Sequence, residues 1–441
     1  MSDIENQREM AMALQIQPEI FKLDVDCFEE LFGWLSLDDL HAFGQTCKRM
    51  QQVAGHYFRL TYPGVEVLCR SDGIYYGAIK YSRNNVKING FADYVENIRI
   101  HEEGSFRFAQ LNEFKSLKEI YFCRISLTDE RIACIKKFLG KAEVIEMVDC
   151  DNTEDLYERF LKYCTDMKHL SVKYINGKVH PEYDWMLQHY PKLEQLVLHD
   201  KKCPPPLDEQ LLTTFFKQNT NIKHFAANET LLLFIRHSIV TSNAKFDSMS
   251  ILLKTDENVE IRTLMNEFHE QEIYKELHLY VHTPKQGSCQ VAPTVAGTVE
   301  KLSYVMFIDD LRVLHLVNLK ELQCGLIQPN LNMESVADAL VNLQRFSVWF
   351  ANQDLIFALI RRSRKLCNIS VINMEEVERK PVTVLDLDLW NKERGKLIGA
   401  RKVTVYVDEK LFLATKEATQ NKDYKWIEIK RHYSQCWIKD Y

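Results

Sequence analysis

The chain has 441 residues, of which 46% are hydrophobic and 27% charged, and its formal net charge is −6. These values are typical of a globular protein, and they exclude a disordered chain and the basic face that a nucleic-acid-binding protein needs. The sequence has no apolar run near the roughly 18 residues of a membrane span, no apolar signal peptide at its start and no Cys-x-x-Cys pair among its twelve cysteines.

Residues 1–20 are expected to be flexible, and residues 21–60 to form a block of three short helices. Apolar side chains recur at helical spacing in the first of these helices, at Val25, Phe28, Leu31, Phe32 and Leu35. Ser36 is a predicted N-cap of the second helix, because two aspartates follow it in the first turn, where the helix dipole favours carboxylates. Helices of this length bury little surface on their own, so the block needs a neighbour in the same chain or in another protein.

Residues 61–94 are expected to form a linker and the N-terminal cap of a repeat array that occupies residues 95–441. In the array, apolar residues recur at offsets 0, +3 and +5 of a short motif. Fourteen copies begin at Val95, Leu117, Ala142, Met167, Leu193, Ile222, Phe246, Tyr274, Val299, Leu319, Leu343, Leu366, Ala400 and Tyr424. Most intervals fall between 20 and 29 residues, and the longer interval before Ala400 contains a strand-like segment at residues 382–390.

This Leu-x-x-Leu-x-Leu pattern resembles the leucine-rich repeat superfamily, whose period is about 20–29 residues. Offsets +3 and +5 point to one face of a strand, and each strand is too short to bury that face without stacking on its neighbours. Right-handed crossovers through helices make such strands parallel. We therefore predict an α/β fold: a three-helix block followed by a solenoid with parallel strands on its concave face and helices on its convex face.

Offsets +2, +4 and +6 should line the concave face of the solenoid, and most are polar, as alternation along a strand requires. In the C-terminal half, aromatic and basic residues gather at these offsets. Such residues are typical anchors of protein interfaces. The candidate target-binding residues are Tyr280, Arg345, Trp349, Lys402 and Tyr406. The alternative interpretation is that an aromatic such as Trp349 is ordinary core.

The N-terminal block carries a second resemblance. Residues 23–50, "LDVDCFEELFGWLSLDDLHAFGQTCKRM", resemble an F-box, with Asp24 in place of the usual Pro and Met50 in place of the usual aromatic residue. An F-box in front of leucine-rich repeats is the order found in F-box/leucine-rich repeat proteins. By this resemblance, the residues that bind the Skp adaptor would be Leu23, Phe28, Leu31, Phe32, Leu35, Leu40, Cys47, Lys48 and Arg49.

The resemblance implies a non-catalytic subunit of a Skp–cullin–F-box ubiquitin ligase. The block would bind the Skp adaptor, and through it a cullin scaffold, while the repeats hold an unidentified target protein for ubiquitination. The alternative is a scaffold of leucine-rich repeats with no ligase attached, in which the helices only cap the array.

Catalytic motifs are not found in the sequence. It contains no phosphate-binding loop, no G-x-S-x-G and no H-E-x-x-H, so we expect no enzymatic activity, no cofactor and no metal. Scattered cysteines without a secretion signal indicate a protein of the cytoplasm, the nucleus or both.

Overall fold

Parallel strands laid side by side in chain order form the body of the protein. The computed structural model describes residues 20, 23–62, 67–70, 73–76, 86–101, 108, 111, 114–150, 156–173, 184–199, 208–254, 259–281, 293–308, 315–327, 332–375, 383–420 and 422–432. The predicted flexible segment at residues 1–20 lies outside these residues, apart from Ile20.

Each strand from β4 to β17 pairs in parallel with the next one along the chain. The strands are β4 (Asn97–His101), β5 (Glu119–Cys123), β6 (Val144–Val148), β7 (His169–Lys173), β8 (Gln195–His199), β9 (His224–Asn228), β10 (Phe246–Leu253), β11 (Tyr274–Val281), β12 (Val299–Ile308), β13 (Glu321–Ile327), β14 (Arg345–Asn352), β15 (Asn368–Glu375), β16 (Val403–Val407) and β17 (Ile427–Arg431). The predicted α/β fold with a parallel sheet is confirmed.

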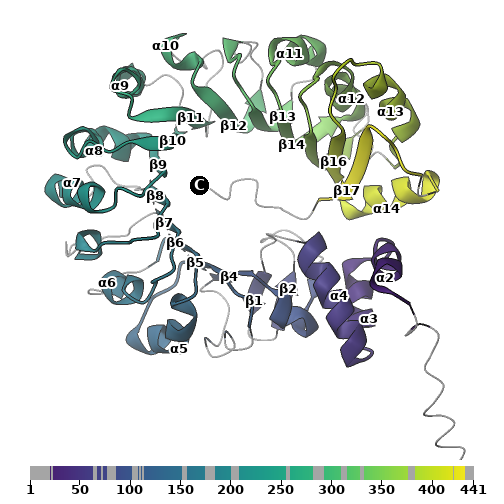
Figure 1. Cartoon of the computed structure of the whole chain (residues 1–441), viewed down its shortest axis with the longest axis horizontal. Coiled ribbons are helices and arrows are strands. Elements are labelled where there is room, and N and C mark those ends of the chain that lie inside the picture. The colour runs from purple at the N-terminus through teal and green to yellow at the C-terminus, as the bar shows by residue number, and fades with distance from the viewer. Residues whose placement is uncertain are drawn as a thin grey trace, which may run out of the picture.

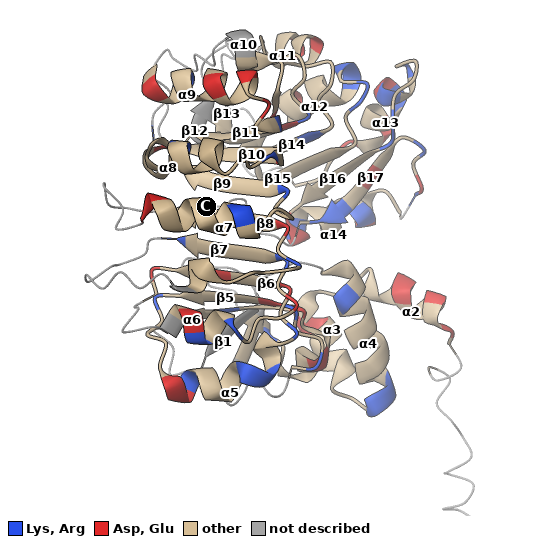
Figure 2. Cartoon of the chain, turned by 60° about the vertical axis from the view of Figure 1, so that its left-hand side comes forward, with Lys and Arg blue, Asp and Glu red and all other residues tan. Residues whose placement is uncertain are grey.

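Helices occupy the outer side of this curved sheet (Figure 1). They are α5 (Asp129–Leu139), α6 (Leu156–Leu161), α7 (Glu209–Gln218), α8 (Glu229–Thr241), α9 (Val259–Glu270), α10 (Pro293–Ala296), α11 (Met333–Ala339), α12 (Gln353–Arg362), α13 (Leu387–Gly395) and α14 (Glu409–Ala418), with a short 3₁₀ helix, η4 (Asp184–Leu187). Acidic and basic residues are interspersed on these helices (Figure 2). None of the helices in the described part of the chain is long and apolar enough to cross a membrane.

Burial along the strands follows the apolar repeat. In β5, Ile120 and Phe122 at offsets +3 and +5 are fully buried, while Glu119 at offset +2 is partly exposed. In most strand pairs the same offsets stack, as Ile120 lies opposite Ile145 of β6 and Phe122 opposite Met147. At β11–β12 and at β15–β16 the register shifts by two residues, so an offset +3 residue lies opposite an offset +5 residue and the apolar face stays continuous. The repeated apolar positions therefore form one continuous core between the sheet and the outer helices.

The described part of the strand-like segment at residues 382–390, which begins at residue 383, is not a strand, so that expectation was wrong. Residues 383–386 have no regular structure, and the helix α13 begins at Leu387. Arg394 of this helix is fully buried, where burial lowers its pKa to about 10, so it remains charged at neutral pH. Its guanidinium donates hydrogen bonds of 2.6–3.1 Å to the backbone carbonyl oxygens of Ile360, Ser363, Arg364, Leu366 and Arg401.

The chain begins with three helices, α2 (Val25–Phe32), α3 (Leu37–Gly44) and α4 (Lys48–Thr61). Ser36 is the N-cap of α3, as predicted, because its hydroxyl accepts a hydrogen bond of 3.1 Å from the backbone N–H of Asp39. Phe28 and Phe32 stack with ring centroids 5.6 Å apart in the centre of the block. The three helices therefore have an apolar core of their own.

The helical block packs on the start of the array. Three short strands, β1 (Val67–Arg70), β2 (Gly73–Tyr76) and β3 (Val86–Lys87), and a 3₁₀ helix, η2 (Asn89–Tyr94), follow it; β1 pairs with β2 and with β4. Phe91 of η2 stacks on Phe58 of α4, with ring centroids 5.1 Å apart. The backbone N–H of Gly90 donates a hydrogen bond of 3.1 Å to the Nε2 atom of His41.

The same block also packs on the end of the array, where α4 and α2 lie beside β17 and α14 (Figure 1). Arg431 of β17 donates one hydrogen bond of 2.9 Å to the hydroxyl of Tyr62 and another of 3.0 Å to the backbone carbonyl of Gly33. The ammonium of Lys416 lies 4.3 Å from the ring centroid of Trp34. The block thus joins the first and last units, and the array closes into a ring.

Candidate functional site

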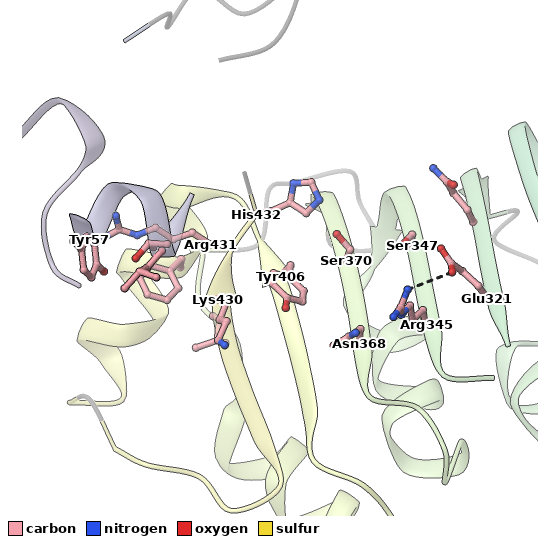
Figure 3. A pocket seen from close by; sticks show the side chains of 15 residues that line it. Tyr57, Glu321, Arg345, Ser347, Asn368, Ser370, Tyr406, Lys430, Arg431 and His432 are labelled. Carbon is pink, nitrogen blue, oxygen red and sulfur yellow. Dashed lines mark ion pairs between the residues drawn. The ribbon is translucent and has the colours of Figure 1, made fainter. Parts of the chain in front are cut away.

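A cavity of about 700 Å³ opens on the inner face of the ring, where the helical block meets the last five strands (Figure 3). This volume falls within the usual range of ligand pockets. The cavity is lined by Tyr57, Leu60, Thr61, Glu321, Gln323, Arg345, Ser347, Asn368, Ser370, Tyr406, Phe412, Ile429, Lys430, Arg431 and His432.

Two rows of polar side chains cross the strands at the floor of the cavity. In the first row, Glu321 of β13 lies opposite Arg345 of β14, which lies opposite Asn368 of β15. The second row runs two residues further along each strand and contains Gln323, Ser347, Ser370, Tyr406 and Lys430. These are the offsets that alternation predicts on the concave face, so the polar floor follows directly from the repeat.

The remaining wall comes from the two ends of the chain. Tyr57, Leu60 and Thr61 enter from α4, and Phe412 enters from α14. Leu60 is 57% exposed, which is high for a leucine and places an apolar edge beside the polar floor. Because α4 and β17 are brought together by the closure of the ring, the cavity exists only in the closed form.

Cations outnumber carboxylates around the cavity floor. The carboxylate of Glu321 lies 3.7 Å from both the ammonium of Lys301 and the guanidinium of Arg345. The carboxylate of Glu428 lies 3.6 Å from Lys402 and 3.4 Å from Lys430. Each carboxylate is therefore shared between two cations, which leaves an excess of positive charge on both sides of Asn368 and Ser370.

Arg431 and His432 differ from the other basic residues of the cavity, because they are not available for a ligand's charge. The Arg431 guanidinium is almost fully buried and lies 3.5 Å from Glu409. Burial raises the pKa of that glutamate, and the charge of Arg431 opposes the rise. Burial lowers the pKa of His432 to about 4, so its imidazole is neutral at pH 7. The accessible positive charge in the cavity is that of Arg345 and Lys430.

The five predicted target-binding residues do not lie together in one site. Arg345 and Tyr406 line the cavity, and Lys402 stands beside it as a partner of Glu428. Trp349 is half-buried on β14 and Tyr280 is buried on β11, and neither contributes to the cavity.

The predicted adaptor-binding residues also fall into groups. Phe28, Phe32 and Leu40 are buried in the core of the helical block, so they hold the block together instead of presenting a surface. Leu31 is 38% exposed, and Lys48 and Arg49 are exposed. The half-buried members of the set are Leu23, Leu35 and Cys47.

Most residues that line the cavity were not among the predicted site residues, and Lys430 and Tyr57 illustrate two different reasons. Lys430 stands at offset +6 of the last repeat, and the pattern that selected Tyr406 could have found it. The position of Tyr57 in the cavity could not be predicted, because no local sequence pattern indicates that α4 faces β17. Among the side chains that the structure describes, no group of three or more His, Cys, Asp or Glu residues is placed to hold a metal ion.

Comparison of the sequence with models of known protein families gave no match, and comparison with curated proteins gave none either.

Proposed function

We propose that this protein is the substrate-recognition subunit of a Skp–cullin–F-box ubiquitin ligase. In this proposal, α2–α4 form the F-box that binds the Skp adaptor, and the parallel array is a leucine-rich repeat solenoid that holds the target on its inner face. The protein performs no chemistry itself. It raises the effective concentration of target lysines near a ubiquitin thioester carried by another subunit.

The observation that carries the proposal is an apolar surface on a block whose core is already complete. Val25 and Leu31 of α2 are 52% and 38% exposed, although Phe28 and Phe32 on the same helix are fully buried. They flank the buried stripe of a short helix at the start of the chain. Exposed Lys48 and Arg49 at the start of α4 lie near this surface, since Arg49 donates to the backbone carbonyl of Leu23 at 3.5 Å. The exposed carboxylates Asp26, Glu29 and Glu30 lie on the same helix, so these apolar side chains are bordered by charges of both signs. Exposed apolar side chains with a charged rim fit a protein partner.

Adaptor capture by the full-length chain tests this proposal. Replacement of Phe32 by a charged residue would unfold the block, so the variant carries V25E and L31E, which change only exposed positions. We expect the wild-type chain to recover a Skp adaptor and a cullin from cell extract, and the double variant to recover at least tenfold less. V341E is the matched control, because Val341 is 58% exposed in a turn before β14. Failure of the wild-type chain to bind a purified Skp adaptor would overturn the proposal.

A second candidate function is a scaffold without a ligase. The closure of the ring favours this function, because the helical block packs on the end of the array through contacts that involve Arg431, Lys416 and Glu409. The block therefore has a structural role that needs no adaptor. In that case the V25E and L31E changes leave all partners of the protein unaffected.

A further inference from the structure

We propose that the cavity between α4 and β13–β17 is a binding site for an extended peptide that carries two oxyanions, as carboxylates or as phosphate groups. The identification of that peptide as a segment of a ubiquitination target rests on the proposed function. The binding of the peptide to the cavity does not, and it can be tested without any ligase component.

Charge is the first argument. Among the residues that line the cavity, Arg345, Lys430 and Arg431 are cations and Glu321 is the carboxylate. Arg431 is matched by Glu409, and Glu321 is shared between Lys301 and Arg345. The cavity as a whole therefore prefers an anion. Acidic and basic residues are mixed over the outer helices, so this excess is a local feature and not a general property of the surface (Figure 2).

The geometry of the ion pairs is the second argument. Arg345 and Glu321 are 3.7 Å apart, and Lys430 and Glu428 are 3.4 Å apart. Both distances exceed those of ordinary hydrogen bonds, which lie at about 2.7–3.2 Å. Both cations are more than half exposed. Each can turn its donors toward a ligand without breaking a tight internal bond, and an Arg–oxyanion contact is the stronger kind of hydrogen bond.

The space between the two cations is the third argument. Asn368, Ser370 and Tyr406 lie between Arg345 and Lys430 on the intervening strands, where Figure 3 shows them along the cavity floor. Their amide and hydroxyl groups donate hydrogen bonds without adding charge. Such groups suit the backbone carbonyls and polar side chains of a peptide laid across the strands.

The length of the cavity sets the spacing of the oxyanions. Arg345 on β14 and Lys430 on β17 are three strand spacings apart across the sheet, about 14 Å at about 4.8 Å each. They are also two residues apart along the strands, about 7 Å, because Lys430 belongs to the second row, so their backbone positions are about 16 Å apart. An extended peptide rises about 3.4 Å per residue, so side chains four positions apart span about 14 Å and point to the same face. The long, exposed side chains of Arg345 and Lys430 cover the remaining difference, so oxyanions at positions i and i+4 can meet both cations at once, whereas adjacent oxyanions cannot.

Fluorescence anisotropy with the purified full-length chain tests the site. The probe is fluorescein-labelled Gly-Glu-Ser-Gly-Ser-Glu-Gly, which has glutamates at positions i and i+4. The comparison peptides have the same composition with adjacent glutamates, glutamine in place of both glutamates, or phosphoserine in place of both. We expect the adjacent and glutamine peptides to bind at least tenfold more weakly than the probe. Tighter binding of the phosphoserine peptide would identify phosphate as the preferred source, and weaker binding would identify carboxylate; either result supports the proposal.

Variants of the chain tie the binding to the cavity. R345E and K430E should each weaken binding of the probe at least tenfold. R345Q and K430Q, which serve if charge reversal disturbs the fold, should weaken binding about threefold to tenfold. K137E is the matched control, because Lys137 is exposed on the outer helix α5. Equal binding of the glutamine peptide, or unchanged affinity in both cavity variants, would overturn the proposal. A chain that binds the adaptor but not the peptide overturns only this inference, and the reverse result overturns only the proposed function.

Discussion

Arg431 and Tyr62 are 369 positions apart in the chain, yet the guanidinium of one donates a hydrogen bond of 2.9 Å to the hydroxyl of the other. Together with the bond from Arg431 to the carbonyl of Gly33, this contact ties the last strand to the helical block. A solenoid is usually held only by contacts between neighbouring units. Here a contact between the two ends adds to them.

Loss of the Arg431 side chain should open the ring. R431A removes the hydrogen bonds to Tyr62 and Gly33 and leaves the Tyr62 hydroxyl, the Gly33 carbonyl and Glu409 without the Arg431 cation, at a cost of about 2–4 kcal/mol. We expect faster amide hydrogen exchange in α2–α4 and a larger radius of gyration by small-angle scattering. K430A is the matched control, because the neighbouring Lys430 is exposed and makes no contact across the closure that the structure describes. Unchanged exchange in R431A would show that the closure does not depend on this residue.

A buried ion pair between neighbouring strands should be costly to break. The ammonium of Lys173 on β7 lies 3.1 Å from the carboxylate of Glu146 on β6, and both side chains are less than 5% exposed. Removal of one partner leaves an uncompensated buried charge, so K173M and E146Q should each lower the free energy of unfolding by about 3–5 kcal/mol. The double variant should recover much of the loss. Urea unfolding of the single and double variants measures the coupling.

The pair that lies just before the same two strands provides the control. Lys168 and Glu143 are 2.8 Å apart, but their side chains are 52% and 37% exposed. Exposed ion pairs are screened by solvent and contribute little to stability, so K168M should have little effect on the free energy of unfolding. Equal costs for K168M and K173M would contradict the role that we assign to burial.

Stability should fall on acidification through buried histidines. Burial lowers the pKa of His278 to about 3, and the nearby cations Lys301 and Lys320 add to the shift. Between the unfolded pKa of about 6.5 and this value, the unfolded chain binds a proton that the folded chain does not, so stability decreases as the pH falls. The contribution of His278 reaches about 2 kcal/mol at pH 5.

Thermal unfolding at pH 7.5 and pH 5.0 measures this effect. We expect the midpoint of the wild-type chain to drop at pH 5.0, and the drop to be smaller in H278Q, which can keep the contact of 3.3 Å to the hydroxyl of Ser250. H237Q changes an exposed histidine of α8 and should match the wild type at both pH values. A full wild-type drop in H278Q would rule out His278 as a source of acid sensitivity.

The parallel sheet could be predicted from the sequence because each strand carries its own signal. Ile120 and Phe122 are buried for a reason that is local to a few residues, and the same reason applies to every repeat. The segment at residues 382–390 was misread because its apolar residues alternate. Leu387 and Trp390, three positions apart, are instead buried on one side of α13.

The cavity could be predicted only in part. Arg345 and Tyr406 belong to the repeat pattern, so alternation was enough to place them on the inner face. The contribution of Tyr57 depends on the summed curvature of every unit between α4 and β17, and small rotations add up over the whole array. No local pattern reports that sum. Phe28 and Phe32 were predicted to bind the adaptor, because an apolar stripe on a helix does not show whether the same chain or a partner protein covers it.

The joining of the two ends by Arg431 bears on how this architecture can change over time. An open array tolerates the gain or loss of a unit, because only the neighbouring units must adjust. In a closed array, one additional unit would shift β17 past Tyr62 and Gly33. The strands that form the floor of the cavity would then no longer lie beside α4, which forms part of its wall. The number of units is therefore fixed by the closure, and variation should concentrate in the connecting segments and not in the count of repeats.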